Sequence, residues 1–489
     1  MKTTTKSSSL LLHNGGSIPL SRLPVMNAEE MAQQIVAAVK AGAEIAAFFG
    51  RPATAGSGCQ LLAVLLDRAQ GALRVLSARV NDSWPSITPE CPAAHLFERE
   101  IAEQGNVAVT GHPWLKPVRM DAQFFRVEGE EVHEVAVGPV HAGVIEPGHF
   151  RFQCHGETVL HLEISLGYQH RGVEPGLERG PEVRSIHLAE TLAGDTTIGH
   201  ATAYCETMEA LCGREAPPRA QALRAIALEL ERIANHIGDL GALAGDVGFL
   251  PTSSWCGRIR GDVLNVSALL CGNRFGRGLV RPGGVAFDAD DHLLGQVKER
   301  IQSCLRDATG ACELLWTTPS VLARFEGTGA ISQETAVEIG LTGPAARACG
   351  IERDVRSDLP TGIWRFTQVP VSTWRTGDVF ARAYVRWLEV QRSFAFIEEQ
   401  LGALPPGDIC VGLPRPSRSA LAVSLVEGWR GAICHAVMTN GEGRFSRYKV
   451  VDPSFHDWFG LALAMRGQPI SDFPLCNKSF NLSYCGHDL

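Results

Sequence analysis

The sequence has no pair of cysteines in Cys-x-x-Cys spacing, although 14 of its 489 residues are cysteine. The cysteines stand mostly one at a time, a pattern that favours free thiols in a reducing compartment over disulfides. Long apolar runs are also lacking. Stretches such as residues 61–66 are far shorter than the roughly 18 residues that a membrane-spanning helix needs. We therefore expect no direct membrane span.

Positive charge is scarce as well. Lys and Arg number 45 against 53 Asp and Glu, which gives a net charge of -8. Without a basic field, nucleic-acid binding is not expected. The first residues hold neither a secretory apolar region nor a twin arginine, which predicts a cytoplasmic protein. No P-loop, HExxH motif or nucleophile elbow is present, which argues against a stand-alone enzyme built on one of them.

The N-terminal part of the chain predicts a small α/β domain. Residues 1–26 are rich in Ser and Thr and read as a flexible lead. Asn27 is a candidate N-cap, and the apolar spacing after it predicts one helix that ends near Gly50. Strands are expected at 60–67 and 73–80, and a short helix at 93–104. The domain spans residues 27–120, and the acidic stretch 121–134 reads as a linker.

Residues 135–489 predict a large, mainly helical domain that opens with a β-hairpin. The hairpin pairs residues 148–155 with 158–166 around the turn Gly156-Glu157. Apolar residues recur every three or four positions after Pro217-Pro218 and again after Thr376, which predicts two long core helices. Short strands at 432–438 and 446–451 and a helix at 455–465 follow. The fold class is α+β.

A turn-rich loop before the hairpin concentrates residues that can carry chemistry. Its sequence, Gly-Pro-Val-His-Ala-Gly-Val-Ile-Glu-Pro-Gly-His-Phe, places His141, Glu146 and His149 close together in the chain. A histidine beside a carboxylate can relay protons near neutral pH. The alternative is a tight turn whose histidines hydrogen-bond backbone carbonyls. Composition alone leaves both interpretations open.

Five motifs in the same order along the chain resemble one family. They are Gly-Pro-Val-His-Ala-Gly at 138, His-Arg-Gly at 170, Pro-Pro-Arg-Ala-Gln at 217, Arg-Pro-Gly-Gly-Val at 281 and Gly-Asp-Val-Phe-Ala-Arg at 377. This set resembles the large subunit of group 4, energy-converting NiFe hydrogenases and the quinone-side subunit of complex I. The front unit, with Phe-Glu-Arg-Glu at 97 and Gly-His-Pro at 111, is similar to the accessory subunit of complex I. The resemblance implies a natural fusion of the two, of the C/D type.

The chain departs from that family at the metal ligands. In the hydrogenases, two Cys-x-x-Cys pairs supply four thiolates to nickel and iron, because soft sulfur anions suit that centre. The corresponding positions carry Ala193, Thr196, Ser483 and Gly486 here. Cys485 lies beside one of them and Cys476 lies nine residues earlier, but neither completes a pair. The resemblance, with these departures, therefore implies a hydrogenase-related type that lacks the cysteine ligands and has no NiFe centre and no hydrogen chemistry.

The resemblance brings the two ends of the large domain together. That would gather polar groups at the former metal cavity, and our candidate catalytic residues are His141, Glu146, Asp195, His200, His487 and Asp488. Close titratable groups shift one another's pKa and could form a proton relay. Alternatively, they satisfy one another where a cofactor used to be. His141 also matches the quinone-site histidine, which allows a quinone pocket. His236 and His435, among other histidines, are expected to be surface or satisfied core residues.

These patterns imply a subunit of a redox-driven, ion-translocating complex related to complex I. The chain itself is expected to bind no cofactor other than a candidate quinone. A 4Fe-4S cluster is expected in a neighbouring iron-sulfur small subunit, next to a membrane arm with antiporter-like subunits. The alternative is a non-catalytic scaffold or gating subunit of a membrane cation or proton transporter. In both cases the chain sits on the cytoplasmic face of the inner membrane through its partners.

Overall fold

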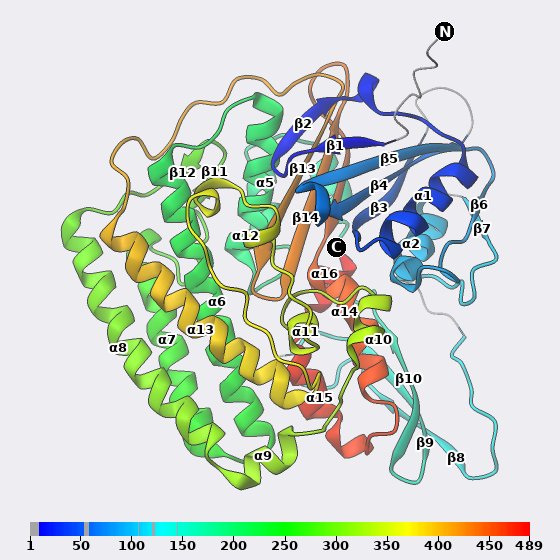
Figure 1. Ribbon diagram of the computed structural model, residues 1–489, viewed down its shortest axis with the longest axis vertical. Coiled ribbons are helices and arrows are strands. Elements are labelled where there is room, and N and C mark those ends of the chain that lie inside the picture. The colour runs from blue at the N-terminus through cyan, green and yellow to red at the C-terminus, as the bar shows by residue number, and fades with distance from the viewer. Residues whose placement is uncertain (1–8, 53–57, 106, 120–122, 144) are drawn as a thin grey trace.

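The N-terminal unit is a four-stranded antiparallel sheet with helices against one face, shown in blue and cyan in Figure 1. The computed structural model describes residues 9–52, 58–105, 107–119, 123–143 and 145–489. The strand order is β1-β5-β4-β3. The elements are β1 (Leu10–Leu12), β3 (Glu44–Pro52), β4 (Cys59–Asp67), β5 (Ala72–Val80), α1 (Ala28–Lys40) and α2 (His95–Gly105), with the short parallel pair β6 (Ser83–Pro85) and β7 (Ala108–Thr110).

The expected helix from Asn27 to Gly50 is wrong in its second half. Asn27 does cap the helix, because its side chain accepts the amide of Glu30. The helix ends at Lys40, and Gly42 takes a positive φ of 99° that only glycine adopts easily. The following run becomes β3, which is buried because α2 packs near it on one side and the C-terminal sheet on the other. The strands expected at 60–67 and 73–80 are confirmed.

The expected flexible lead is wrong for the part that the structure describes. Residues 1–8 lie outside the described residues, but β1 pairs with β5. A further strand, β2 (Gly16–Pro19), pairs with a strand near residue 420, in the C-terminal part of the chain. The lead therefore joins the two units. Asn14 strengthens this link: its side-chain oxygen accepts the Leu425 amide at 2.7 Å, and its amide donates to the carbonyls of Leu359 and Leu425.

The hairpin belongs to a three-stranded sheet at the lower right of Figure 1. β9 (His149–His155) and β10 (Thr158–Ser165) confirm the expected hairpin. The third strand, β8 (Val132–Val137), begins inside the segment expected to be a linker. Residues 121–122 of that segment lie outside the described residues.

Long helices form the core of the large unit, in green and yellow in Figure 1. The two helices expected from apolar spacing are confirmed as α6 and α13. Pro217 and Pro218 start α6 because proline fits the first turn, which has no need of its amide. The main helices are α5 (Thr197–Cys212), α6 (Pro218–Asp246), α7 (Leu250–Cys271), α8 (Asp291–Trp316) and α13 (Val379–Gly402). Shorter ones are α3 (Val173–Glu178), α4 (Ser185–Glu190), α9 (Pro319–Phe325), α10 (Gln333–Glu338), α11 (Gly343–Ala348) and α12 (Val355–Asp358), beside the small ribbon β11 (Val280–Arg281) and β12 (Gly284–Val285).

A second four-stranded sheet lies between the bundle and the N-terminal unit, with the order β15-β14-β13-β2. Its strands are β13 (Ala420–Gly428), β14 (Gly431–Thr439) and β15 (Phe445–Val451), and the helices α14 (Pro453–Ala464), α15 (Phe473–Phe480) and α16 (Tyr484–Asp488) follow. β14, β15 and α14 match the expected elements, whereas β13 was not expected. Every residue of β13 is buried, so its sequence lacks the alternation that marks a half-exposed strand.

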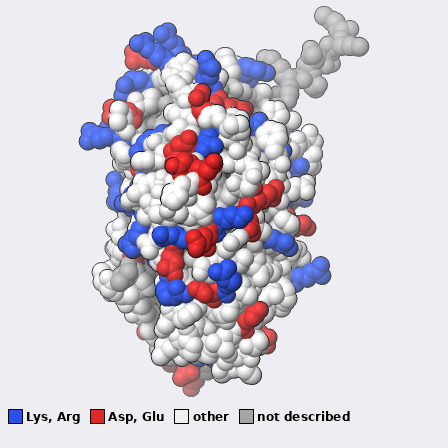
Figure 2. Space-filling view, turned by 90° about the vertical axis from the view of Figure 1, so that its left-hand side faces the viewer, with Lys and Arg blue, Asp and Glu red and all other residues white. Residues whose placement is uncertain are grey.

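The surface mixes charges of both signs. Figure 2 shows acidic and basic side chains interspersed on the left-hand face of Figure 1, where α7 and α8 lie. Across the described ranges, every helix is too short or too polar to cross a membrane. The 14 cysteines are free thiols, and most are buried.

Candidate functional site

The four positions of the family's metal ligands come together in two loops. Ala193 and Thr196 lie just before α5, and Ser483 and Gly486 lie at the start of α16. The Cys485 thiol hydrogen-bonds the backbone of Gly194, which joins the loops. Arg430 also bridges them, because it binds Asp195 and donates to the carbonyl of Asn481 at 2.5 Å. The expected meeting of the two ends of the domain is therefore present.

A buried chain of four side chains runs from this meeting point into the C-terminal sheet. His200 Nε2 lies 3.0 Å from Asp452 Oδ2, and His200 Nδ1 lies 3.1 Å from His435 Nε2. His435 Nδ1 lies 2.9 Å from the Tyr448 hydroxyl. With both rings neutral, each link has one donor and one acceptor: Tyr448 donates to His435, His435 to His200, and His200 to the carboxylate.

Burial and charge keep the two ends of this chain in different protonation states. Burial lowers the pKa of His435 well below its ordinary value, against the charge of Asp452. Burial opposes ionisation of Asp452, but the hydrogen bond from His200 and the charge of Arg430 lower its pKa to about 2. Burial also raises the pKa of Tyr448. Asp452 is thus an anion at neutral pH, while His435 and Tyr448 are neutral.

Gly486 lies directly against this chain. A β-carbon at residue 486 would stand 2.6 Å from Cγ of Asp452, closer than real contacts allow. The Asp452 carboxylate occupies the space that a longer side chain at this ligand position would need. A cysteine at residue 486 would already clash with Asp452 at its β-carbon, so one of the two residues would have to shift.

Asp195 and Thr196 form a second set of contacts around Arg430. The Arg430 guanidinium binds both Asp195 oxygens, at 2.6 and 2.7 Å, and stacks on Trp429 with 3.9 Å between Cζ and the ring centre. The Trp429 indole donates to the Asp195 carbonyl and to Thr196 Oγ1. Burial would raise the pKa of Asp195, but Arg430 holds it below the ordinary value. The Thr196 hydroxyl is therefore engaged.

Glu146 and His141 form a third set, on the hairpin loop. Glu146 Oε2 accepts the backbone amides of Tyr484 and Cys485, both at 3.2 Å. His141 Nε2 lies 3.4 Å from the Tyr484 hydroxyl. Burial and the nearby Glu146 carboxylate raise the pKa of the Cys485 thiol to about 12. Cys485 is therefore a thiol, not a thiolate, at neutral pH.

His487 and Asp488 form a fourth set with the loop at residues 167–170. Asp488 accepts the backbone amides of Gly167 and Gln169 at 2.8 Å each and lies 3.0 Å from His487 Nδ1. The Asp488 carbonyl also accepts from Arg119. These bonds anchor the last residues of the chain. The six candidate residues thus divide among four sets of contacts, and they do not form the single cluster that we expected.

The ligand positions do not fit a nickel-iron centre. Ala193 and Gly486 have no donor atom, Thr196 is bound by Trp429 and Arg430, and Ser483 Oγ accepts the Gly486 amide at 2.9 Å to cap α16. Among the described residues, no group of three or more His, Cys, Asp or Glu side chains is placed to hold a metal ion. A hydroxyl that is already used as a cap is a poor substitute for a bridging thiolate.

Sequence reasoning missed several groups at this site: Asp452, Tyr448, Arg430 and Trp429. It also grouped His435 with the histidines expected at the surface or in a satisfied core. That residue is indeed buried and hydrogen-bonded, but one of its partners is His200. One sequence signal could have identified Asp452. An Asp directly before a proline is typical of a helix N-cap, and Asp452 caps α14 in this way, which fixes the position of its carboxylate.

Comparison with known families assigns both units of the chain. Residues 39–132 match the family described as the respiratory-chain NADH dehydrogenase 30 Kd subunit, and residues 246–419 match the 49 Kd subunit. The chain is thus a fusion of two complex I-type subunits. It belongs to the family that joins the 49 Kd subunit of NADH dehydrogenase to the large subunits of group 4 hydrogenases.

Similar proteins come from both branches of that family. The carbon monoxide-induced hydrogenase of Rhodospirillum rubrum is 33% identical over 71% of this chain and 97% of its own length. NADH-quinone oxidoreductase subunit 4 of Thermus thermophilus is 28% identical over 70% of this chain and 90% of its own. Formate hydrogenlyase subunit 5 of Escherichia coli is 28% identical over 91% and 84%. Such relatives are subunits of complex I-related and hydrogenase-related complexes.

Proposed function

We propose that this chain is the large subunit of a complex I-related, redox-driven ion-translocating complex that neither oxidises nor produces hydrogen. The observation that carries the proposal is the chain Asp452–His200–His435–Tyr448, whose carboxylate fills the space beside ligand position 486. A polar chain built into the core, with a partner for each link, takes the place of a thiolate set. Nothing in this function needs nickel.

The four hydrogen-bonded side chains Asp452, His200, His435 and Tyr448 can move one proton by reversing their hydrogen bonds. His435 can pass its Nε2 proton to Nδ1 of His200 while its own Nδ1 takes the hydroxyl proton of Tyr448. A proton from the far side then restores the Tyr448 hydroxyl, so one proton has moved along the chain to His200. The ionised Asp452 stabilises the positive charge on His200 while this takes place. The buried residues therefore support a proton relay and not only a satisfied remnant.

The proposed partners are an iron-sulfur small subunit, which carries the 4Fe-4S cluster, and a membrane arm with antiporter-like subunits. Apolar side chains exposed at one end of the helix bundle suit docking. The start of α7 lies beside the end of α8, since Thr252 donates to the Ala311 carbonyl, and Leu250, Trp255 and Leu314 are 65%, 48% and 46% exposed there. Exposed apolar groups that cluster in this way mark interaction sites. We place the complex on the cytoplasmic face of the inner membrane.

The hairpin loop offers a second candidate activity, quinone binding. His141 and Tyr484 present two hydrogen-bond donors beside the aromatic rings of Phe150 and Trp458. A quinone headgroup takes such donors on its carbonyl oxygens. In this role His141 would orient the headgroup and supply a proton. His141→Ala should then lower quinone-linked turnover of the assembled complex, and unchanged turnover would end this candidate.

The main proposal is tested on the purified, assembled complex. We expect metal analysis to find iron from the small subunit and no stoichiometric nickel, and gas chromatography to find no hydrogen evolution. His200→Gln should abolish proton-coupled turnover, whereas His187→Gln, which changes an exposed histidine, should leave it intact. Nickel at one atom per complex would contradict the proposal. Equal turnover in both variants would leave the scaffold or gating role instead.

A further inference from the structure

A cleft of about 650 Å³ opens at the C-terminal end of α5, whose other end follows the first ligand loop. Its walls are residues 13–17, the end of α5 and the loop at 359–365. Glu206, on α5, lines this cleft. Its carboxylate accepts hydrogen bonds from the hydroxyls of Thr361, at 2.8 Å, and Ser424, at 2.5 Å. The residue is only partly exposed, so it stands between solvent and the interior.

A smaller cavity of about 30 Å³ lies behind Glu206. It shares Glu206, Gln221 and Arg224 with the cleft, and it extends inward to Arg356 and Glu427. This space is large enough for a water molecule. Thr202 lines it with a hydroxyl that has no protein hydrogen-bond partner, although the residue is only 7% exposed. A buried hydroxyl without a partner indicates water, because leaving it unsatisfied is costly.

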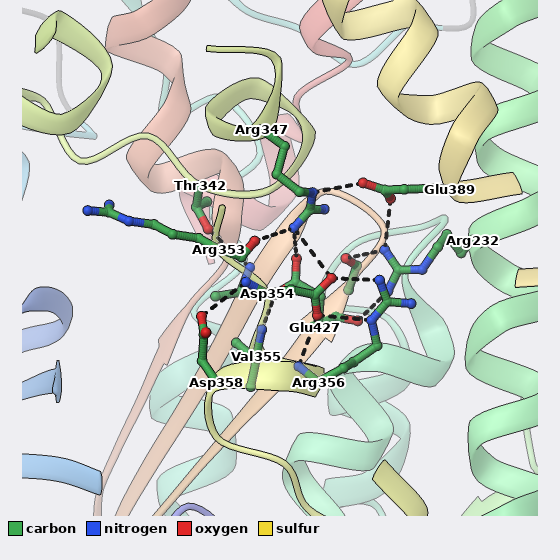
Figure 3. Close-up of polar contacts among 12 residues, drawn as sticks. Arg232, Thr342, Arg347, Arg353, Asp354, Val355, Arg356, Asp358, Glu389 and Glu427 are labelled. Carbon is green, nitrogen blue, oxygen red and sulfur yellow. Dashed lines mark hydrogen bonds and ion pairs between the residues drawn. The ribbon is translucent and has the colours of Figure 1, made fainter. Parts of the chain in front are cut away.

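The inner wall of the cavity belongs to a buried charge cluster. Figure 3 shows its side chains pointing toward one another from α6, α11, α12, α13 and β13. Arg347 binds Glu389 and Glu427, each at 2.8 Å. Further members are Arg232, which binds Glu229 and Glu389, and Arg356, which binds Glu229 and Asp354.

The cluster has one more acid than base. It contains three guanidinium groups, those of residues 232, 347 and 356, and four carboxyl groups, those of residues 229, 354, 389 and 427. His236 donates to Glu389 at 2.8 Å and is neutral, because burial lowers its pKa. One negative charge is therefore uncompensated, and an uncompensated buried charge is strongly unfavourable. A single added proton removes it.

The geometry points to Glu427 as a buried proton-binding site that is loaded from the cleft through Glu206 and water in the inner cavity. A hydronium ion in the cleft protonates the Glu206 carboxylate and becomes water, and the Glu206 O–H then passes a proton to cavity water. That water releases a proton to the Glu427 carboxylate. Only protons move, and Glu206 ends as it began. This inference does not depend on the proposed redox role.

The surroundings of the two carboxyl groups favour proton transfer from Glu206 to Glu427. Burial raises the pKa of Glu206 to about 7, against the hydrogen bonds of Ser424 and Thr361, and Glu209 adds to the rise while Arg224 opposes it. Glu206 can therefore both take and give a proton near neutral pH. The rim of the cleft carries His13, Arg214, Glu215 and Arg365.

Glu427 is held by groups from several elements. Burial and the charge of Asp354 raise its pKa, while Arg347, Arg232 and the amide of Val355 oppose the rise. Glu229, Arg356 and Glu389 complete the charges around it. Its protonated form is thus favoured relative to an ordinary glutamate.

The test follows the infrared carbonyl band of protonated Glu427 in the full-length chain. The band is assigned by its loss in Glu427→Gln, and its exchange is timed after dilution into D₂O. We expect Glu206→Gln to slow this exchange about 100-fold, the range in which a positioned proton-transfer group acts. Glu215→Gln, on the rim of the same cleft, should leave the exchange unchanged.

Thr202→Val gives a second route to the same answer. It removes the hydroxyl that holds water and keeps the side-chain shape, so the exchange should slow while the fold persists. It decides the question if Glu206→Gln does not fold. Two results would overturn the inference: no carboxyl band is lost in Glu427→Gln, or exchange in the Glu206 and Thr202 variants is as fast as in the parent chain.

Discussion

Two buried polar networks lie on the same hairpin, β13–β14, and they are built in opposite ways. The histidine chain, formed by Asp452, His200, His435 and Tyr448, has one hydrogen bond per link and a single ionised group, Asp452. The charge cluster around Arg347 uses forked guanidiniums, each of which binds two or more carboxyl groups. The first arrangement can reverse its bonds with little movement. The second fixes its members in place and holds α6, α11 and α13 against the sheet.

The difference predicts that the charge cluster contributes far more to the free energy of unfolding than the histidine chain does. Arg347→Met should lower the free energy of unfolding by about 3–5 kcal/mol, because it removes the ion-pair partner of the buried Glu427 and one of the two guanidinium partners of Glu389. Urea unfolding of the full-length chain measures this. Arg258→Met, which breaks an exposed pair with Asp262, should cost no more than about 0.5 kcal/mol. Similar losses in the two variants would remove the distinction.

The contribution of the histidine chain to the free energy of unfolding should instead depend on pH and be lost in acid. Asp452→Asn should cost about 1–3 kcal/mol at neutral pH, because the amide carbonyl still accepts from His200 but the charge is gone. The folded-state pKa of Asp452, about 2, is below its ordinary 3.8. Its stabilisation is therefore complete above pH 3.8 and is lost as the pH falls toward 2. Unfolding curves at several pH values should show this part of the acid sensitivity in the parent chain and not in the variant.

A substitution at Gly486 tests how tightly Asp452 of the histidine chain fills the space at this ligand position. Gly486→Ala should cost about 1–3 kcal/mol, the range for overpacking, because the new methyl group meets Asp452. The matched control is Gly257→Ala, inside α7, where a β-carbon meets nothing within 4 Å. That change should stabilise the protein by about 0.5–1 kcal/mol. A tolerated Gly486→Ala would show that a cysteine could be accommodated there.

The smallest effect is expected at Tyr448, the end of the histidine chain that is farthest from Asp452. Tyr448→Phe removes the donor to His435 Nδ1 and should cost about 1 kcal/mol, with the ring packing retained. Thermal unfolding measures the loss. If proton-coupled turnover of the complex stays at the parent level in this variant, the relay does not pass through residue 448.

The sequence predicts the helices of this fold better than its sheets. The apolar periodicity of α6 and α13 is a local signal and is sufficient. β13 and β2 depend on a pairing between residues about 400 positions apart, and no local pattern encodes it. The same reason limits the site. Asp195, Thr196 and His200 can be found because they are neighbours in sequence, whereas His435 and Asp452 reach His200 from 235 and 252 positions away.

Asp488 shows the opposite error. A carboxylate at the end of the chain, beside a histidine, resembles a catalytic group in the sequence. In the structure two backbone amides and His487 occupy its oxygens. Burial opposes its ionisation, but these bonds hold its pKa below the ordinary value. Composition identifies groups that can titrate, but only the contacts decide which of them are free to do so.

The pairing of β2 with β13 bears on how the chain is made. The partner strand of residues 16–19 is synthesised about 400 residues after them. β2 must therefore wait without its partner until β13 has left the ribosome. A cut in the acidic stretch near residue 125 would separate β2 from β13, so two polypeptides divided there would have to form this pairing between separate chains.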